Sequence, residues 1–195
     1  PVTNGKGAFS SSLAEYVIAA ILHFTKQVPR CMKNQEAKRW DPFVMDVVAG
    51  KTVGFVGYGH IAQQSAVLCK ALGMNIIACR RSEGGDDVVV PAKTYAPDQR
   101  LKLFEESDYV VCSLPGTAAT KDFCGAQEFG AMKSTGVFVS LGRGAAVDED
   151  ALVDVLQKGQ IRGAALDVFK EEPLPSSSPL WSLGDRILIT AHNAD

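Results

Sequence analysis

From Lys51 onward, short apolar runs alternate with stretches of helical periodicity, and this alternation restricts the chain to a small set of folds. Helical patterns occupy 61–72, after the first run, and 148–159, after the fourth. The runs are nearly continuously apolar, as is typical of strands buried on both faces of a parallel sheet. The alternation predicts right-handed βαβ units and an α/β fold with a doubly wound parallel sheet of the Rossmann type. The six predicted strands are 52–57, 75–80, 109–114, 136–141, 163–168 and 186–190.

The first quarter of the chain has a different pattern. Ser12 and Glu15 have the spacing of a capping box, and apolar residues recur at helical spacing to about Gln27. A helix with one buried face is therefore predicted over 12–27. Residues 28–50 mix charges, a proline and single aromatics, which predicts an extended connection that carries a short polar helix.

Composition and charge exclude several classes of partner. The net charge is −2, and the lysines and arginines are spread through the sequence, so neither a nucleic-acid surface nor a site for anionic membranes is expected. The longest apolar stretch is too short to span a bilayer. A small molecule is the expected partner. The chain begins at Pro1 and stops directly after an apolar run, which suggests a piece of a longer polypeptide.

The five cysteines are widely spaced, without a CxxC pair and without histidines at zinc-ligand spacing. No metal site is predicted. Several of the cysteines lie inside apolar runs, which favours buried free thiols over disulfides. A reducing compartment, the cytoplasm, is therefore the expected location.

A glycine-containing turn joins the first predicted strand to the helix that follows it. Gly57 and Gly59, with Ala62, match the pattern G-x-G-x-x-[GA], and the context of strand, turn and helix is the one that a dinucleotide fingerprint requires. Backbone N–H groups at the helix start, including those of His60 and Ile61, attract a pyrophosphate. His60 is interpreted as a spacer in the turn and not as a catalyst. The alternative is a glycine-rich turn without a ligand.

The end of the second predicted strand indicates which dinucleotide is bound. An acidic residue about 20 positions after the first glycine receives the ribose hydroxyls of NAD. Here Arg80, Arg81 and Ser82 occupy that region, and no acid is present. Two guanidinium groups and a hydroxyl favour a 2′-phosphate, so NADP(H) is preferred and NAD(H) remains possible. The alternative is that both arginines are ordinary surface charges.

With these motifs in view, the sequence resembles the D-isomer-specific 2-hydroxyacid dehydrogenases, and in particular NADP-preferring glyoxylate/hydroxypyruvate reductases. The resemblance covers nearly the entire chain in ordered blocks: 2–22, 38–74, 113–152, 165–175 and 189–195. It implies a hydride transfer between NADP(H) and a small 2-hydroxy or 2-keto acid. It does not indicate which acid.

The resemblance implies a catalytic trio. Arg143 would hold the carboxylate of a 2-keto acid and polarise its carbonyl group. His192 would serve as the general acid, with Glu172 as its carboxylate partner. Taken alone, an arginine between two glycines is more often a loop charge, and a single histidine is more often structural. Further cofactor contacts are implied for Leu114, Pro115, Thr120, Leu141, Gly142 and Asp167, of which Asp167 matches the residue that contacts the nicotinamide amide.

The family also implies a division of the chain. Residues 1–45 would form an interdomain helix and a dimerisation arm, 46–190 the dinucleotide-binding domain, and 191–195 a return segment toward a substrate domain that is largely absent. A homodimer is expected, with the contact over the helix at 12–27 and the segment to about 45. The alternative is that the apolar face of this helix packs within one subunit.

Two positions depart from the family pattern: Ser140 replaces a common asparagine, and Ala191 replaces the proline before His192, which leaves the backbone of His192 less restrained. A different class of function also remains open. The C-terminal-binding co-repressors use the same fold as dinucleotide-sensing interaction proteins and keep the trio. Arg80 and Arg81 disfavour an NAD(H) sensor, which would carry an acid there.

Overall fold

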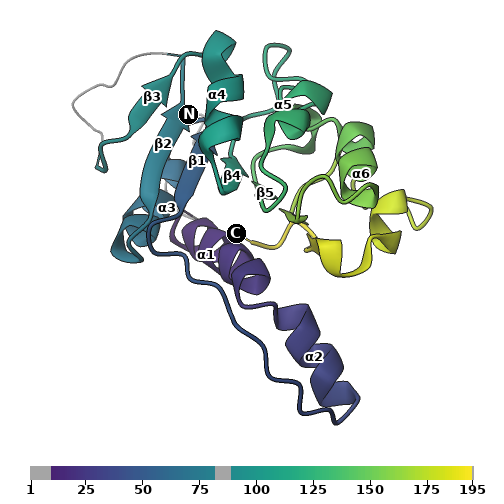
Figure 1. Cartoon of the computed structure of the whole chain (residues 1–195). Helices are drawn as coiled ribbons and strands as arrows, with labels where there is room; N and C mark the ends of the chain where they lie inside the picture. Colours follow the sequence, from purple (N-terminus) through teal and green to yellow (C-terminus); the bar gives the residue numbers. More distant parts are fainter. Residues whose placement is uncertain (1–9, 82–88, 195) are drawn as a thin grey trace.

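The computed structural model describes residues 10–81 and 89–194, and a parallel sheet forms its centre. The strand order is β3-β2-β1-β4-β5-β6-β7, and every pairing is parallel (Figure 1). The chain first builds outward from β1 to β3 and then restarts on the other side of β1 with β4. This order confirms the predicted doubly wound Rossmann-type fold. The strands are β1 Thr52–Val56, β2 Asn75–Cys79, β3 Lys93–Tyr95, β4 Tyr109–Cys112, β5 Val137–Ser140, β6 Gly163–Leu166 and β7 Ile187–Ile189.

Helices cover both faces of the sheet. On one face, α1 (Ser10–Thr25) and α3 (His60–Ala71) pack against strand residues such as Val53 and Phe55. On the other face, α4 (Arg100–Glu106), α5 (Ala126–Ala131) and α6 (Glu149–Gln157) pack against residues such as Val56 and Phe138. Successive strand residues point to opposite faces, so each strand contributes to both cores. This explains why the strand sequences are apolar throughout.

All six predicted strands are present, and the sequence prediction missed one strand and two helices. β3 has three residues, of which Lys93 and Thr94 are exposed at the edge of the sheet. A half-exposed strand of this length has no continuous apolar run for sequence analysis to find. α4 and α5 have only seven and six residues, too short for a periodic pattern.

The N-terminal helix was predicted correctly, but its start was not. α1 begins at Ser10, and Ser12 lies inside the helix with its hydroxyl donated to the backbone oxygen of Ala194 at 2.6 Å. The capping-box prediction is therefore wrong. Val17, Ile21 and Phe24 are buried against the sheet and α3. The apolar face of α1 thus packs within the chain.

After α1 the chain leaves the sheet. The helix α2 (Val28–Glu36) and the extended segment that follows it project away from the sheet and return beside each other (Figure 1). We call residues 28–47 the arm. A salt bridge of 2.9 Å between Arg30 and Asp41 connects α2 to the extended segment, and the guanidinium of Arg30 also lies over the ring of Phe43. The short polar helix and the extended connection thus agree with the prediction.

Among the described helices, none combines the length and the apolar character needed to cross a membrane.

Candidate active site

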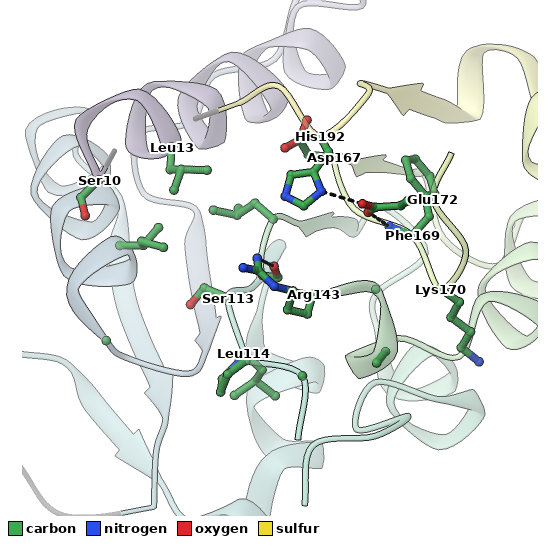
Figure 2. A pocket seen from close by; sticks show the side chains of 18 of the residues that line it. Ser10, Leu13, Ser113, Leu114, Arg143, Asp167, Phe169, Lys170, Glu172 and His192 are labelled. Atoms are coloured by element: carbon green, nitrogen blue, oxygen red, sulfur yellow. Dashed lines mark hydrogen bonds and ion pairs between the residues drawn. The ribbon is translucent and has the colours of Figure 1, made fainter. Parts of the chain in front are cut away.

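A cavity of about 860 Å³ opens at the carboxyl ends of the central strands (Figure 2). It lies where the chain order reverses between β1 and β4, which is where ligands bind in open α/β sheets. The cavity extends from the turn after β1, past the ends of β4 and β5, to the segments after β6 and β7. Its lining comprises Ser10, Leu13, Gly59, His60, Ile61, Ser113, Leu114, Pro115, Gly116, Leu141, Gly142, Arg143, Gly144, Ala145, Asp167, Phe169, Lys170, Glu172 and His192.

The turn at one end of the cavity has the geometry of a phosphate-binding loop. Gly57 has φ +87°, a backbone conformation that other residues rarely adopt, and its N–H donates to the oxygen of Cys79 at 3.0 Å. Gly59 is extended and precedes the first turn of α3, and a Cβ atom placed on it would meet no atom within 4 Å. Gly59, His60 and Ile61 line the cavity, so the start of α3, with the positive end of the helix dipole, borders it.

His60 has a contact that the sequence did not predict. Its Nδ1 atom lies 2.8 Å from the hydroxyl of Ser10, the first residue of α1. This contact holds the imidazole beside the turn. Ile61 also lines the cavity, and Ala62 is buried at the contact between α3 and the sheet, where the fingerprint calls for a small residue.

Arg143 enters the cavity from the end of β5. The two glycines beside it are required by close packing of the backbone. A Cβ atom on Gly142 would lie 2.8 Å from the backbone nitrogen of Leu114, and one on Gly144 would overlap the carbonyl group of Phe169. The guanidinium is exposed and donates to the oxygen of Gly142 at 2.8 Å, which leaves most of its donors available to an anion.

Glu172 and His192 form an ion pair across the same cavity, with 2.7 Å between Oε2 and Nδ1 (Figure 2). Glu172 also accepts a hydrogen bond of 2.8 Å from the N–H of Phe169. Burial acts to raise the pKa of Glu172, but the hydrogen bonds from His192 and Phe169 and the positive charges of His192 and Arg143 outweigh it and lower the pKa below its usual value. An ionised carboxylate only accepts hydrogen bonds, so Nδ1 carries a proton.

Asp167 lies behind the ion pair and is only 2% exposed. Its carboxylate accepts hydrogen bonds from the hydroxyl of Thr190 and from the N–H groups of Asn193 and Ala194. Its backbone oxygen accepts from the N–H of His192 at 2.9 Å. Asp167 thus binds the segment that carries His192 from both ends, a role that the sequence did not indicate.

The structure brings most of the predicted site residues together, but not all of them. Gly57 and Thr120 do not line the cavity. Thr120 instead donates to the oxygen of Pro115 at 2.5 Å and shapes the loop after β4. Arg80 and Arg81 lie outside the cavity as well, at the end of β2 beside the turn. Ser82 lies outside the described residues.

Sequence analysis also missed part of the lining. Six of the missed residues are neighbours of predicted residues on the same strand ends, so their position after an apolar run was the available signal: Ser113, Gly116, Gly144, Ala145, Phe169 and Lys170. Ser10 and Leu13 come from α1, and no local pattern indicates that this helix reaches the cavity.

The cysteines and the acidic groups do not suggest a metal centre. Cys69, Cys79, Cys112 and Cys124 are buried and reduced, and burial raises the pKa of the Cys69 and Cys79 thiols to about 12 and about 11. In the part of the chain that the structure describes, no group of three or more His, Cys, Asp or Glu side chains is arranged to hold a metal ion.

Comparison with known proteins agrees with this geometry. The chain is 37% identical over 197 residues to a glyoxylate reductase of Aeropyrum pernix, covering 96% of this chain and 58% of the relative. It is 34% identical over 200 residues to a D-3-phosphoglycerate dehydrogenase of Methanocaldococcus jannaschii, covering 98% and 36%. The chain therefore spans between about a third and three fifths of these two relatives.

Solved structures match the fold closely. A probable 2-hydroxyacid dehydrogenase from Rhizobium etli, in complex with NADP, HEPES and L(+)-tartaric acid, superposes with a TM-score of 0.87 at 28% identity, covering 96% of this chain and 59% of that one. The NADPH-dependent glyoxylate/hydroxypyruvate reductase of Sinorhizobium meliloti, in apo form, superposes with a TM-score of 0.88 at 26% identity, covering 97% and 95%.

The family model described as D-isomer specific 2-hydroxyacid dehydrogenase, NAD binding domain, matches residues 18–194. This range includes the sheet, the turn after β1 and the whole trio, so the match and the cavity identify the same part of the molecule. The chain belongs to the D-isomer-specific 2-hydroxyacid dehydrogenase family and carries its NAD-binding domain.

Proposed function

We propose that the chain is the catalytic and cofactor-binding part of an oxidoreductase that transfers a hydride between NADP(H) and a 2-hydroxy or 2-keto acid. One observation carries the proposal: the ion pair of His192 and Glu172 and the guanidinium of Arg143 line the same cavity as the turn at Gly59. A dinucleotide whose pyrophosphate binds at the start of α3 would extend along the ends of β1 and β4. The rest of the dinucleotide would then point toward Arg143, Glu172 and His192.

The side chains of this cavity have distinct tasks in the proposed reaction. When bound, the cofactor supplies or accepts the hydride. Arg143 binds the carboxylate of the keto acid and withdraws charge from its carbonyl oxygen. The protonated imidazole of His192 delivers a proton to that oxygen, and Glu172 stabilises the charged imidazole before the transfer. In the oxidative direction, His192 removes the proton from the hydroxyl group.

Other residues of the site would hold the cofactor. The open space at Gly59 and the free N–H groups of α3 fit a pyrophosphate. Leu114, Pro115, Leu141 and Gly142 offer the apolar wall on which the nicotinamide ring would rest, with Asp167 near its amide.

The preference for NADP(H) rests on Arg80 and Arg81. The N–H of Gly57 bonds to the last residue of β2, so Arg80 begins directly beside the phosphate turn. Among the described residues, neither guanidinium forms an ion pair or hydrogen bond, and Arg80 stands where an NAD-binding protein would carry an acid. Three of the similar structures contain NADP or NADPH, which supports the same assignment.

The first prediction concerns substrate and cofactor together. The full natural polypeptide that contains this chain should reduce glyoxylate or hydroxypyruvate, and NADPH should support this with a kcat/KM at least about tenfold above that of NADH, because charge-assisted hydrogen bonds to the 2′-phosphate contribute 1.5–3 kcal/mol each. The measurement is the loss of absorbance at 340 nm with a panel of 2-keto acids and both reduced cofactors.

Variants of this chain separate the two parts of that prediction. Arg80→Ala should weaken binding of NADPH about tenfold or more and leave binding of NADH unchanged. Lys158→Ala removes one positive charge from an exposed pair with Asp154 and should change neither. Equal losses for both cofactors would contradict the role of Arg80. Binding of dinucleotide without reduction of any acid in the panel would instead favour the dinucleotide-sensing alternative.

The arm supports a second proposal, a homodimer, and the buried free thiols support a location in the cytoplasm. Six of the ten exposed large apolar side chains in the described residues lie on the arm, among them Trp40 at 95% and Val44 at 90% exposure. A monomer gains nothing by extending such side chains into water, and patches of this kind mark protein interfaces. Because the apolar face of α1 is already packed within the chain, the arm is, among the described residues of 1–45, the part that offers exposed apolar side chains to a second copy.

The corresponding prediction is that the chain sediments as a dimer at micromolar concentration. Trp40→Glu combined with Val44→Glu should convert it to a monomer, because two charges would then lie in an apolar interface. Trp181→Glu changes an exposed tryptophan outside the arm and should leave the dimer intact. Analytical ultracentrifugation measures all three proteins. A monomer in the unmodified chain, or a dimer that survives the double substitution, would contradict the proposal.

A further inference from the structure

The segment that carries His192 is held in an unfavourable backbone conformation. His192 has φ +51°, in the left-handed region that residues other than glycine adopt only at an energetic cost. The residue before it is Ala191, which does not restrict the chain as a proline would. The side chains of both Ala191 and His192 are exposed, so packing does not fix them. The conformation must be maintained by hydrogen bonds to the residues around the segment.

Those hydrogen bonds converge on Asp167 and on α1. The hydroxyl of Thr190 lies 2.5 Å from the carboxylate of Asp167 and 3.1 Å from the hydroxyl of Tyr16. At the other end of the segment, Ser12 donates to the oxygen of Ala194. Residues 190–194 are thus held between the buried carboxylate and two side chains of α1, and the path from Tyr16 to His192 runs through Thr190 and Asp167.

The chemistry of this path favours Tyr16 as a fixed anchor. Its ring is half-buried, and burial raises the pKa of its hydroxyl to about 12, so the group remains neutral at physiological pH. Thr190 has one hydroxyl hydrogen, and the short contact with an ionised carboxylate is the stronger place for it. Tyr16 therefore completes the hydrogen bonding of Thr190 and orients the hydroxyl that restrains Asp167.

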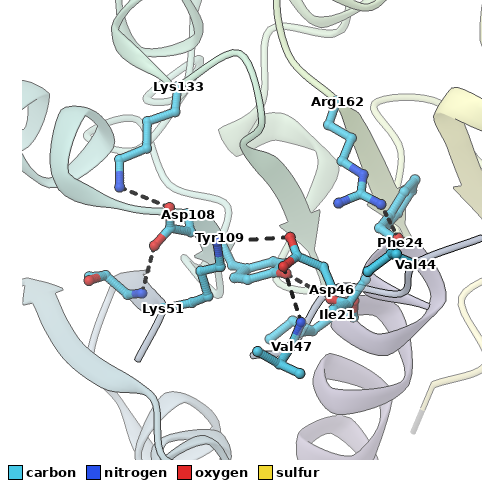
Figure 3. Close-up of polar contacts among 12 residues, drawn as sticks. Ile21, Phe24, Val44, Asp46, Val47, Lys51, Asp108, Tyr109, Lys133 and Arg162 are labelled. Carbon is cyan, nitrogen blue, oxygen red and sulfur yellow. Dashed lines mark hydrogen bonds and ion pairs between the residues drawn. The ribbon is translucent and has the colours of Figure 1, made fainter. Parts of the chain in front are cut away.

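A second tyrosine–threonine pair, at the opposite end of α1, can be compared with the pair of Tyr16 and Thr190. There the hydroxyl of Thr25 lies 2.7 Å from the hydroxyl of Tyr109 on β4 (Tyr109 is labelled in Figure 3), in a buried place remote from the cavity. Both pairs join α1 to a strand or its end through a tyrosine and a threonine. Only the pair of Tyr16 and Thr190 leads to the ion pair of His192 and Glu172.

From these contacts we infer that Tyr16 is a positioning residue for the proton transfer: through Thr190 and Asp167, its hydroxyl fixes the 190–194 segment so that Nδ1 of His192 meets Glu172. The inference rests on the proposed function, because His192 is the proton donor only in that reaction. It adds to it a residue of α1 that does not touch the substrate.

The test compares Tyr16→Phe with Tyr109→Phe. Each substitution removes one hydroxyl of a tyrosine–threonine pair and keeps the ring. In the full natural polypeptide, Tyr16→Phe should lower kcat about tenfold, the equivalent of one net hydrogen bond, with the KM of the keto acid and the Kd of NADPH unchanged. Tyr109→Phe should lower the thermal midpoint at least as much as Tyr16→Phe does, and it should leave kcat within a factor of two.

A second measurement does not depend on turnover. Nitrogen-15 shifts of the histidine rings of this chain report which imidazole nitrogen carries the proton in the neutral form. His192 should be protonated on Nδ1 in the unmodified chain and in Tyr109→Phe, and Tyr16→Phe should show partial conversion to the Nε2 form. If these shifts change while no variant reduces a keto acid, the positioning role stands and the proposed function fails.

Threonine variants cover the case in which Tyr16→Phe does not fold. Thr190→Val removes the hydroxyl and should reproduce the loss of kcat and the altered nitrogen-15 shifts. Thr190→Ser restores a hydroxyl at the same place and should recover both. The inference is overturned if Tyr16→Phe matches Tyr109→Phe in kcat and in the shifts of His192, or if Thr190→Val leaves both unchanged.

Discussion

Replacement of His192 by glutamine is expected to lower kcat of the full natural polypeptide about 10³-fold, within the range that general acid–base groups contribute. Glutamine fills a similar volume and still offers an amide N–H to Glu172, but it does not titrate and delivers no proton to the carbonyl oxygen. The Kd of NADPH should change less than about twofold, because the turn at Gly59 lies at the other end of the cavity. Steady-state kinetics and a fluorescence titration with NADPH measure the two quantities.

His23 provides the matched control for this substitution. It lies near the end of α1, half-buried with its ring against Phe24, and desolvation lowers its pKa. His23→Gln should reduce stability modestly and leave kcat within a factor of two. If His192→Gln retained a tenth or more of the original kcat, His192 would not be the acid, and the ion pair with Glu172 would have to be read as a structural contact.

The meeting of Arg143 and His192 at one edge of the sheet was predictable from the sequence because each follows a strand closely, whereas Glu172 was implied by the family resemblance alone. Apolar runs identify the strands, parallel strands end at one edge of the sheet, and the residues after them therefore meet there. Arg143 and His192 each follow their strand, β5 and β7, by three residues, and Glu172 follows β6 by six. The order of the strands and the residue types at their ends could thus be predicted from the sequence, and the family resemblance assigned the roles.

Contacts between distant segments were not predictable in this way. Tyr16 and Thr190 are separated by 174 positions, and neither belongs to a motif. The contact of Ser12 with Ala194 has the same character, and here a local rule was misleading: the spacing of Ser12 and Glu15 suggested a helix cap, whereas tertiary packing uses the hydroxyl elsewhere. In the arm, the extended segment was predictable, because the sequence there has no regular apolar pattern. Its projection away from the sheet was not predictable.

Gly144→Ala is expected to have the largest effect on the site as a whole. Gly144 lies where the loop that carries Arg143 meets the loop that leads to Glu172. A Cβ atom there would lie 2.5 Å from the backbone nitrogen of Lys170 and closer still to the carbonyl group of Phe169. Both obstacles are backbone atoms, so no side chain can rotate away, and one of the two loops has to move.

The loop of Phe169 resists that movement at several points. The N–H of Phe169 donates to Glu172, the N–H of Lys170 donates to Glu149, and the ammonium of Lys170 lies 2.8 Å from Asp122. We therefore expect Gly144→Ala to lower the free energy of unfolding by about 3 kcal/mol, the upper part of the range for overpacked sites. Because a displacement of 1 Å at a catalytic group costs about 10²-fold, kcat should fall by at least that factor.

Gly130→Ala is the control that makes this result interpretable. Gly130 lies exposed in α5, a Cβ atom on it would meet nothing within 4 Å, and alanine is favoured over glycine in a helix by about 1 kcal/mol. This variant should be as stable as the unmodified chain or more so, with unchanged kcat. Urea unfolding of both variants, followed by tryptophan fluorescence, gives the free energies. If Gly144→Ala were as stable and as active as Gly130→Ala, the two loops would not be in the close contact that places Arg143 opposite Glu172 and His192.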